Sequence, residues 1–319
     1  MSGGAAATQP ASQPDAVSTR FALGCGNFGG VGSAPEFFGQ GLTSDQALAL
    51  MDAAWELGIT RFDTADAYGG GRSETAIGAW IASRGTRPRL TTKTYNPMQA
   101  GGDYGLKPER IARQLRASLD RLGVGQVDLY LAHDFDPDVP LPETAGAFAA
   151  ARDAGLIADW GVSNFDAAQL AGCLDAGAPR AVQNCYSLLT RADGQDVLPL
   201  CARHRVSYQA FSPLAGGWLT GKYRPGEPFP AGSRMTQRPE PYDGFRTGAT
   251  FAALDRLRAL AQAAGISLAG LALAWLLADE RVSQIVIGPG RPEHLAPVRE
   301  ALSRPLTSAE LAEIDQVVA

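Results

Sequence analysis

Four side chains able to hold or transfer a proton follow separate apolar runs of the sequence. Asp63 and Tyr68 lie in FDTADAYGGGRSE (residues 62–74), Lys93 ends LTTK, and His133 ends LYLAH. A tyrosine can protonate a carbonyl oxygen, but its ordinary pKa of about 10 is too high for efficient donation at neutral pH. A nearby ammonium lowers that pKa, a carboxylate keeps the ammonium charged, and an imidazole can orient the substrate oxygen. The group lacks a hydride donor, so this chemistry would require a nicotinamide cofactor.

Each of these residues also has an ordinary structural explanation. A lone aspartate at a strand end often caps the next helix, a lone lysine extends to solvent, and a lone histidine near a turn is usually structural. The catalytic interpretation therefore depends on whether the fold brings the four side chains to one place.

Short strand-like runs alternate with helical patterns along almost the whole chain. The expected strands are RFALGCG, ITRFDTA, RLTTK, VDLYLAH, ADWGVSN, AVQNCY, SYQAFS and QIVIG, and a helical segment follows each of them. In the first of these helices, Thr43 and Gln46 fit a capping box. The face predicted for burial in the same helix contains Leu48, Met51 and Trp55.

The segment KPERIARQLRASLDRLG (107–123) is the most regular helical pattern in the chain. Pro108 fits the first turn, where its missing N–H removes no hydrogen bond. The predicted buried stripe consists of Ile111, Leu115, Leu119 and Leu122.

Strict alternation of strands and helices requires a parallel sheet, because a helix must return the chain before each new parallel strand is added. About eight such units predict an α/β protein with a (β/α)8 TIM barrel as a single domain over residues 20–319, preceded by a flexible tail over residues 1–19. A doubly wound sheet is the alternative, with GCGNFGG (24–30) as its dinucleotide loop. The segment after that motif has no helical pattern, so the motif lacks the context it needs.

The composition restricts the class of function. The chain has 319 residues, 45% of them hydrophobic, and a net charge of −5 without a basic run. This is ample material for a packed core and argues against a nucleic-acid partner. The cysteines lie far apart and form no disulfide framework or zinc motif, and the three histidines make a metal centre unexpected. The cysteines are Cys25, Cys173, Cys185 and Cys201.

Residues 1–19 are rich in Ala, Ser, Gln and Pro and lack the basic and apolar regions of a signal peptide. The longest apolar stretch, LAGLALAWLLA (268–278), is too short to span a bilayer. These features predict a cytoplasmic protein without a membrane partner. No sequence pattern indicates the oligomeric state.

The ordered set FDTADAYGGGRSE, TTK, DLYLAH, WGVSNF, VQNCYS and FSPLAGGWLTGKY resembles the successive signatures of the aldo-keto reductases, from residue 20 or so to the C-terminus. It is similar to the branch of aflatoxin-aldehyde reductases, bacterial reductases and potassium-channel β-subunits. The resemblance implies that Tyr68 is the general acid/base and that Lys93 activates it. It also implies that Asp63 is the partner of Lys93 and that His133 orients the carbonyl.

The resemblance further implies a nicotinamide site. Phe211 would stack on the nicotinamide ring, where many members have tyrosine, since stacking needs only the ring. The carboxamide contacts would be Ser163, Asn164 and Gln183. The contacts along the pyrophosphate would be Ser212, Leu214 and Gly216.

The adenosine end departs from the family pattern. Relatives resemble G-x-S-x-x-E-Q-L-x-E-N after the eighth strand, whereas this chain has GPGRPEHLAPV (288–298). Gly288 agrees with the pattern, Gly290 stands for its serine, and His294 stands for its glutamine. Arg291 could bind a 2′-phosphate through its planar guanidinium or could remain a solvated charge. We expect NADPH (NADP) as the cofactor, with NADH (NAD) as the alternative.

Long segments on the barrel mouth usually shape specificity, and residues 95–105 and 222–245 are the expected rim. Tyr95, Trp218 and Phe229 would either line a pocket for an apolar or aromatic carbonyl compound or pack the loops against each other.

The predicted activity is NAD(P)H-dependent reduction of an aldehyde or ketone to an alcohol, with Tyr68 as general acid. Two alternatives use the same residues: NAD(P)-dependent oxidation of a sugar or alcohol, and a non-catalytic cofactor-sensing regulatory subunit. A metal-dependent hydrolase would need several histidine and acidic ligands at strand ends, and only His133 and Asp63 lie suitably.

Overall fold

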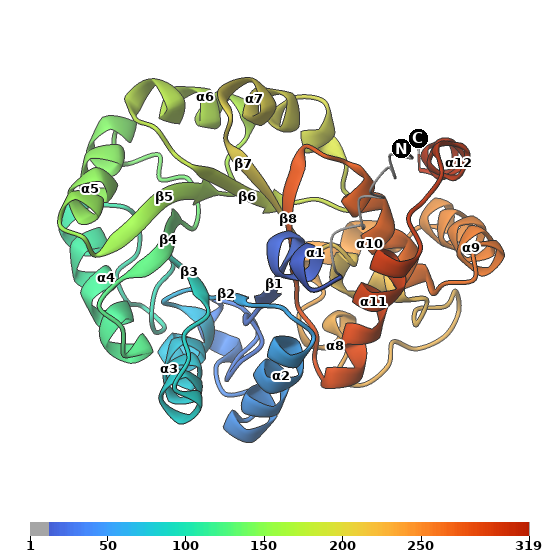
Figure 1. Ribbon diagram of the computed structural model, residues 1–319, viewed down its shortest axis with the longest axis horizontal. Coiled ribbons are helices and arrows are strands. Elements are labelled where there is room, and N and C mark those ends of the chain that lie inside the picture. The colour runs from blue at the N-terminus through green and yellow to red at the C-terminus, as the bar shows by residue number, and fades with distance from the viewer. Residues whose placement is uncertain (1–12, 319) are drawn as a thin grey trace, which may run out of the picture.

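The computed structural model describes residues 13–318, and in it eight parallel strands pair in chain order and close into a barrel. The ring closes where β1 pairs with β8, with Phe21 opposite Ile285. Figure 1 shows the ring of strands surrounded by helices. The predicted (β/α)8 barrel is therefore confirmed. The strands are β1 (Phe21–Gly24), β2 (Arg61–Asp63), β3 (Arg89–Thr94), β4 (Val127–Ala132), β5 (Ile157–Ser163), β6 (Ala181–Cys185), β7 (Ser207–Phe211) and β8 (Val282–Ile287).

A helix follows each strand, because the chain must return along the outside before the next parallel strand can be added. Large rings such as the stacked pair Phe148 and Trp160, with centroids 5.4 Å apart, fill the layer between strands and helices. The covering helices are α2 (Ser44–Glu56), α3 (Arg72–Arg84), α4 (Pro108–Leu122), α5 (Leu141–Asp153), α6 (Ala167–Ala176), α7 (Val197–His204), α9 (Gly248–Ala263), α10 (Leu268–Ala278), α11 (Ala296–Ser303) and α12 (Ser308–Val317).

Two of these helices test the sequence patterns directly. The capping box of α2 is present, since the Thr43 hydroxyl accepts from the Gln46 N–H and the Gln46 side chain accepts from the Thr43 N–H. The buried face of α2 differs in part from the predicted one, because Met51 is buried whereas Leu48 and Trp55 are only partly buried. In α4, Pro108 begins the helix and the whole predicted stripe is buried.

The connection from β7 to β8 is longer than the single helix that the sequence predicts. It contains the 3-10 turn η4 (Ala215–Thr220), the short helix α8 (Arg234–Gln237), the turn η5 (Glu240–Phe245), and then α9 and α10. Helix α10 is apolar on every side and is buried from Leu268 to Leu276, which explains why its sequence shows no helical periodicity.

Within residues 13–318 no single helix is both long enough and apolar enough to cross a membrane. Only α9 and α10 taken together reach that length and apolarity, and they are bent by 85° relative to each other.

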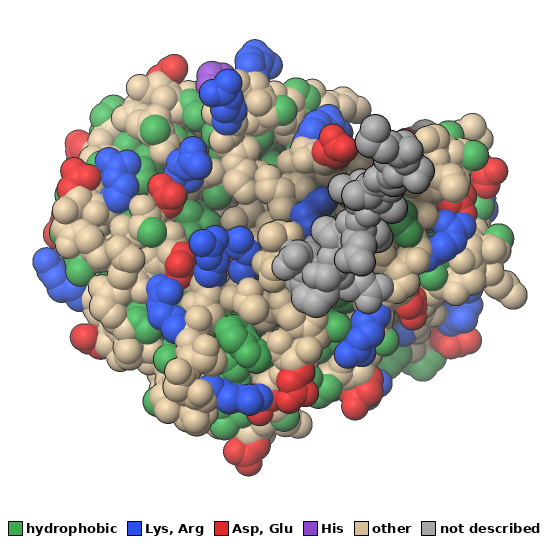
Figure 2. All heavy atoms as spheres, in the orientation of Figure 1, with side chains coloured by type: hydrophobic (Ala, Val, Ile, Leu, Met, Phe, Trp, Pro, Cys, Tyr) green, Lys and Arg blue, Asp and Glu red, His purple; other side chains and the backbone are tan. Residues whose placement is uncertain are grey.

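The predicted boundary of the N-terminal tail differs from the structure. Residues Gln13–Arg20 form helix α1, which lies at the N-terminal ends of the strands, while residues 1–12 lie outside the described residues (Figure 1). Helix α1 is held there because Val17 is buried and Arg20 donates to the carbonyls of Leu277 and Val282 at 3.2 and 3.0 Å. Figure 2 shows acidic and basic side chains interspersed over this face. The C-terminal ends of the strands open on the opposite side.

Candidate active site

The loop after β2 brings Tyr68 over the barrel mouth. Asp63 is the last residue of β2, and Tyr68 begins the 3-10 turn η2 (Tyr68–Gly71). Gly69 has φ +60, and a Cβ there would lie 2.7 Å from the Phe28 carbonyl oxygen of the loop after β1. The glycines after Tyr68 thus serve a left-handed turn and a close backbone approach.

A buried ion pair forms the base of the site. Lys93 Nζ donates to Asp63 Oδ1 at 2.5 Å and to the Thr64 carbonyl oxygen at 2.9 Å. The side chain of Lys93 is 1% exposed and that of Asp63 is 4% exposed, so solvent screens the interaction between their charges little. Burial alone favours the neutral amine, but Asp63 and Tyr68 outweigh it and raise the pKa of Lys93 above its usual value. Lys93 therefore carries a fixed positive charge inside the barrel.

Tyr68 and His133 complete the group. Lys93 Nζ lies 5.2 Å from the centroid of the Tyr68 ring, and the rings of Tyr68 and His133 meet edge-on with centroids 5.4 Å apart. Four side chains from β2, η2, β3 and the end of β4 therefore meet at one place, as the sequence predicts. His133 Nδ1 is buried and, among the described residues, has no hydrogen-bond partner.

The electrostatics of this group differ in one respect from the sequence prediction. Burial raises the pKa of Tyr68, and the charge and hydrogen bond of Lys93 lower it only in part, so the net shift is upward. The expected net acidification of the phenol is therefore wrong for this structure, because desolvation outweighs the ammonium. Burial, with a smaller effect of Lys93, holds the pKa of His133 well below its usual range. Tyr68 is thus protonated and His133 neutral at neutral pH.

The predicted carboxamide contacts lie beside this group. Ser163 Oγ donates to the Gln183 carbonyl oxygen at 2.7 Å, and Asn164, with φ +60, donates to the His133 carbonyl oxygen at 2.8 Å. Gln183 Nε2 donates to Asp63 Oδ2 at 2.7 Å and to Gln209 Oε1 at 2.9 Å. Both amide hydrogens of Gln183 are therefore used inside the protein, and its Oε1 is the atom left for a ligand. The contact of Gln183 with Asp63 is a positioning role that the sequence did not reveal.

The predicted ring and pyrophosphate contacts form a continuous turn after β7. Phe211 ends the strand, and Ser212 follows with φ +54, a conformation that few non-glycine residues adopt. Leu214 precedes η4, where Gly216 has φ +62. The Ser212 hydroxyl lies 3.2 Å from the hydroxyl of Tyr242 in η5, so the long β7 connection folds over this turn.

The predicted adenosine contacts follow β8. Gly288 has open space around it, and the Gly290 N–H donates to His294 Nδ1 at 3.2 Å. Arg291 is exposed and lies 3.6 Å from Glu293. Burial, together with Arg291 and Lys222, lowers the pKa of His294.

Lys222 and Arg234 are additional cations that the sequence prediction missed. Partial burial and the positive charge of Arg234 lower the pKa of Lys222. Lys222 also approaches Gly217, where a Cβ would lie 2.7 Å from its Nζ. The ammonium of Lys222 next to a glycine-rich turn has the chemistry to bind the phosphates of a dinucleotide.

The rim aromatics pack the loops. Trp218 is fully buried, and its ring contacts those of Tyr223, Phe229, Phe245 and Phe251. Tyr95 pairs with Tyr104 at 6.0 Å between centroids. The sequence predicted that these aromatic residues either line a substrate pocket or pack the loops against each other. Trp218 and Phe229 pack the loops.

The pocket above the catalytic group is polar. It has a volume of about 250 Å³ and includes Tyr68, His133 and Asn164 in its wall. Its other lining residues are Gly32, Ser33, Asn96, Asp134 and Arg238. The expectation of an apolar or aromatic pocket is not met at this wall, because the aromatic side chains are used within the loops.

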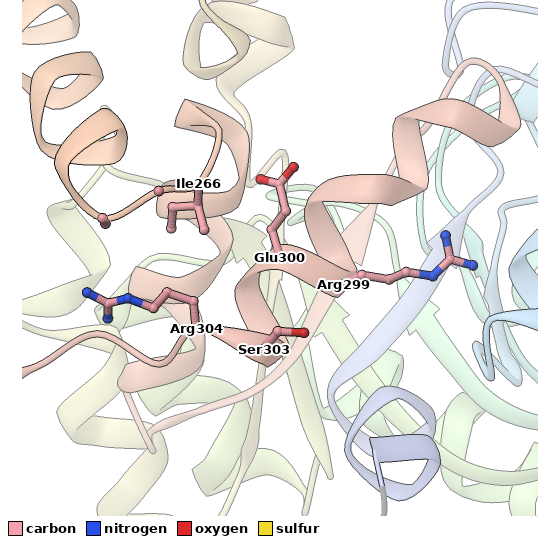
Figure 3. Close-up of a pocket in the computed structure, with 7 residues that line it drawn as sticks. Ile266, Arg299, Glu300, Ser303 and Arg304 are labelled. Atoms are coloured by element: carbon pink, nitrogen blue, oxygen red, sulfur yellow. The ribbon is translucent and has the colours of Figure 1, made fainter.

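A second hollow of about 420 Å³ lies away from the barrel mouth, between α11 and the turn from α9 to α10. In Figure 3, Arg299 and Arg304 point in different directions from its floor. Glu300 accepts hydrogen bonds from the Ser267 N–H and hydroxyl, and Arg304 forms an ion pair with Glu310, so these charges stabilise helix ends.

Residues 13–318 contain no cluster of three or more His, Cys, Asp or Glu side chains placed to hold a metal ion.

The barrel mouth contains a buried lysine–aspartate pair beneath a tyrosine, and comparisons with known proteins assign the chain to a family. The model for the Aldo/keto reductase family matches residues 21–319. A probable voltage-gated potassium channel subunit beta from Oryza sativa subsp. japonica is 32% identical over 297 residues, which cover 88% of this chain and 90% of that protein. An L-glyceraldehyde 3-phosphate reductase from Escherichia coli (strain K12) is 33% identical over 301 residues, 88% of this chain and 86% of that protein. The structure of a glycerol dehydrogenase from Gluconobacter oxydans matches with a TM-score of 0.81 and 27% identity, covering 94% of this chain and 91% of that one.

The chain belongs to the aldo-keto reductase family. It is therefore an oxidoreductase of carbonyl or alcohol groups, and its family uses nicotinamide cofactors. The family assignment predicted from the ordered motifs is confirmed.

Proposed function

We propose that this protein reduces aldehyde or ketone carbonyls with NADPH, and that Tyr68 is the general acid. The observation that carries the proposal is the buried pair of Lys93 and Asp63, 2.5 Å apart, with Lys93 Nζ 5.2 Å from the centre of the Tyr68 ring. A fixed positive charge at this position stabilises negative charge that develops on the phenolic oxygen as its proton leaves.

Each residue of the group has one task in this proposal. A bound reduced nicotinamide supplies the hydride. Tyr68 Oη transfers its proton to the substrate oxygen, and Lys93 stabilises the resulting phenolate. Neutral His133 lies at the edge of the Tyr68 ring and orients the substrate oxygen by hydrogen bonding. Asp63 and Gln183 hold Lys93 and each other in position.

The residues around the group fit a dinucleotide. Ser163, Asn164 and Oε1 of Gln183 would bind the carboxamide, and Phe211 would stack on the ring. The turn from Ser212 to Gly216 would follow the pyrophosphate. The predicted segment after β8, with Gly288, Gly290, Arg291 and His294, would bind the adenosine half. The nearby cations favour NADPH over NADH, because the 2′-phosphate adds negative charge.

The reverse reaction, NADP-linked oxidation of an alcohol, uses the same groups, and one relative is named a glycerol dehydrogenase. A regulatory role is the other candidate, since one relative is named a probable potassium channel subunit beta.

We also propose that the protein is cytoplasmic. Its four cysteines are free thiols, which suits a reducing compartment.

The test combines a binding measurement with a turnover measurement. The purified protein is titrated with NADPH and NADH and then mixed with 4-nitrobenzaldehyde, while the absorbance of the reduced nicotinamide is followed. The proposal expects tighter binding of NADPH and oxidation of the cofactor on mixing. Binding without turnover of this or any other activated aldehyde would instead favour a cofactor-sensing subunit.

A further inference from the structure

The pocket above Tyr68 and His133 contains a guanidinium whose charge the proposed reaction does not use. Arg238 lines this pocket together with Ser33 and Asn96. It follows α8 in the connection between β7 and β8, while the other residues of the pocket wall lie between Gly32 and Asn164 in the sequence. Arg238 is half-buried, so bulk water reaches only part of its side chain.

The position of Arg238 is set by the packing of α8. Met235 of this helix is 4% exposed and accepts a hydrogen bond from Trp218 Nε1 at 3.3 Å, which anchors α8 to the aromatic core of the loop. The Arg238 N–H donates to the Arg234 carbonyl oxygen at 2.8 Å. Gly32 makes room for the side chain, because a Cβ at Gly32 would lie 2.7 Å from Arg238 Nη1. The guanidinium is therefore held against the loop after β1.

The charge of Arg238 is not neutralised within the described part of the chain. Its side chain donates from Nη1 to the Val31 carbonyl oxygen at 3.5 Å, and none of the ion pairs found among residues 17–318 includes Arg238. A guanidinium has five N–H donors in a planar fork that matches the oxygens of a carboxylate or a phosphate. A half-buried guanidinium with one long contact has donors left for such oxygens.

The other charge in the pocket wall is compatible with this assignment. Asp134 is exposed and accepts the Phe135 N–H through Oδ1 at 2.9 Å. It forms no ion pair with Arg238 among the described residues, so it leaves the guanidinium available. Ser33 and Asn96 add polar groups that can bind the same ligand.

We propose that Arg238 is a specificity-determining residue that binds a carboxylate or phosphate group of the carbonyl substrate, placed across the pocket from the reacting oxygen. The inference rests on the proposed function, since it takes Tyr68 and His133 as the reacting end of the pocket. It assigns to this protein an anionic carbonyl compound as its class of substrate.

The test compares substrates that differ in charge but hardly in shape. Reduction of 4-formylbenzoate is compared with that of 4-formylbenzamide, and reduction of glyceraldehyde 3-phosphate with that of glyceraldehyde, in the wild type and in Arg238→Gln. We expect the variant to lower kcat/KM for the preferred anion by about ten- to a hundredfold more than for its neutral partner. The pair that shows this loss tells whether the anion is a carboxylate or a phosphate. Arg224→Gln, which removes an exposed charge from the same connection, should keep the wild-type ratios.

A second readout does not depend on turnover. The alcohols 4-(hydroxymethyl)benzoate and 4-(hydroxymethyl)benzamide, and likewise glycerol 3-phosphate and glycerol, are titrated into the protein saturated with NADPH, which cannot accept a hydride from them, and binding is followed by tryptophan fluorescence. Tighter binding of an anion in the wild type, lost in Arg238→Gln, supports the assignment even if no aldehyde is reduced. Equal binding and equal kcat/KM of charged and neutral partners in the wild type overturn it, while reduction of the neutral aldehydes would leave the proposed reductase activity intact.

Discussion

Lys93 Nζ lies 2.5 Å from Asp63 Oδ1 inside the barrel, where both side chains are almost fully buried. Such a pair is stable only as a pair, because removing one member leaves the other charge without its partner in a poorly solvated place. The pair therefore couples the stability of the barrel to the charge that the proposed reaction needs.

Replacement of either member of this pair should destabilise the protein. Lys93→Met and Asp63→Asn should each lower the free energy of unfolding by about 3 to 5 kcal/mol, since each leaves a buried unpaired charge. The double variant should lose less than the two single losses combined. Urea unfolding of the four proteins measures this coupling, and additive losses would show that the two charges do not depend on each other.

The pH dependence of turnover should differ between the two directions. Burial raises the pKa of Tyr68 above its usual value of 10.0, so the phenol stays protonated and kcat for reduction should be flat between about pH 6 and pH 8. Oxidation of an alcohol needs the phenolate, so its kcat should rise toward alkaline pH. His133 should not titrate in this range, because burial holds its pKa well below 6.5. A step in the reduction profile that His133→Gln removes would contradict the neutral imidazole.

Asp66 should make the folded state less stable as the pH rises. Burial raises the pKa of this carboxyl to about 7, although Thr94 donates to Oδ2 at 2.7 Å, and Oδ1 has no partner among the described residues. A raised carboxyl pKa means that the folded state binds the proton more tightly, so its contribution is fully present below about pH 4 and is lost as the pH rises through about 7.

The replacement Asp66→Asn removes this titration. The variant should therefore gain stability relative to the wild type between pH 5 and pH 8, on the order of a few kcal/mol. Urea unfolding at these two pH values measures the difference. A stability difference between variant and wild type that is the same at both values would show that Asp66 does not titrate in this window.

Arg291 tests the nucleotide preference. Its guanidinium is exposed and only weakly paired with Glu293 at 3.6 Å, so it is available to a 2′-phosphate. Arg291→Ala should weaken NADPH binding by about tenfold and NADH binding much less, as expected for one charge-assisted contact. Arg299→Ala, which removes a charge from the following helix, serves as the control. An equal loss for both nucleotides would remove Arg291 from the 2′-phosphate site.

The sequence predicted the barrel and the central group of the site for a physical reason. About eight alternating strands and helices favour a barrel, and the dinucleotide loop of the alternative, a doubly wound sheet, lacks its helix. In a barrel the C-terminal ends of the strands meet at one mouth, which gathers Asp63, Lys93 and His133. Helix α10 escaped this reasoning because a helix buried on every side has no periodicity. Helix α1 escaped it because a polar segment docks through Val17 and the side chain of Arg20.

The polarity of the pocket above Tyr68 and His133 could not be predicted from the sequence. It depends on how the long connection after β7 folds, which buries Trp218 with Phe229 and brings Arg238 against Gly32. The net pKa of Tyr68 was equally hidden, because it is the balance of desolvation against one ammonium. Contacts between residues this far apart in the chain leave no local pattern.

The most direct test of the proposed chemistry is the turnover of Tyr68→Phe. This change removes the phenolic proton and keeps the ring beside His133 and Lys93. With NADPH bound as in the wild type, kcat for reduction of 4-nitrobenzaldehyde should fall by about a hundred- to ten-thousandfold. A kcat equal to that of the wild type would show that another group donates the proton.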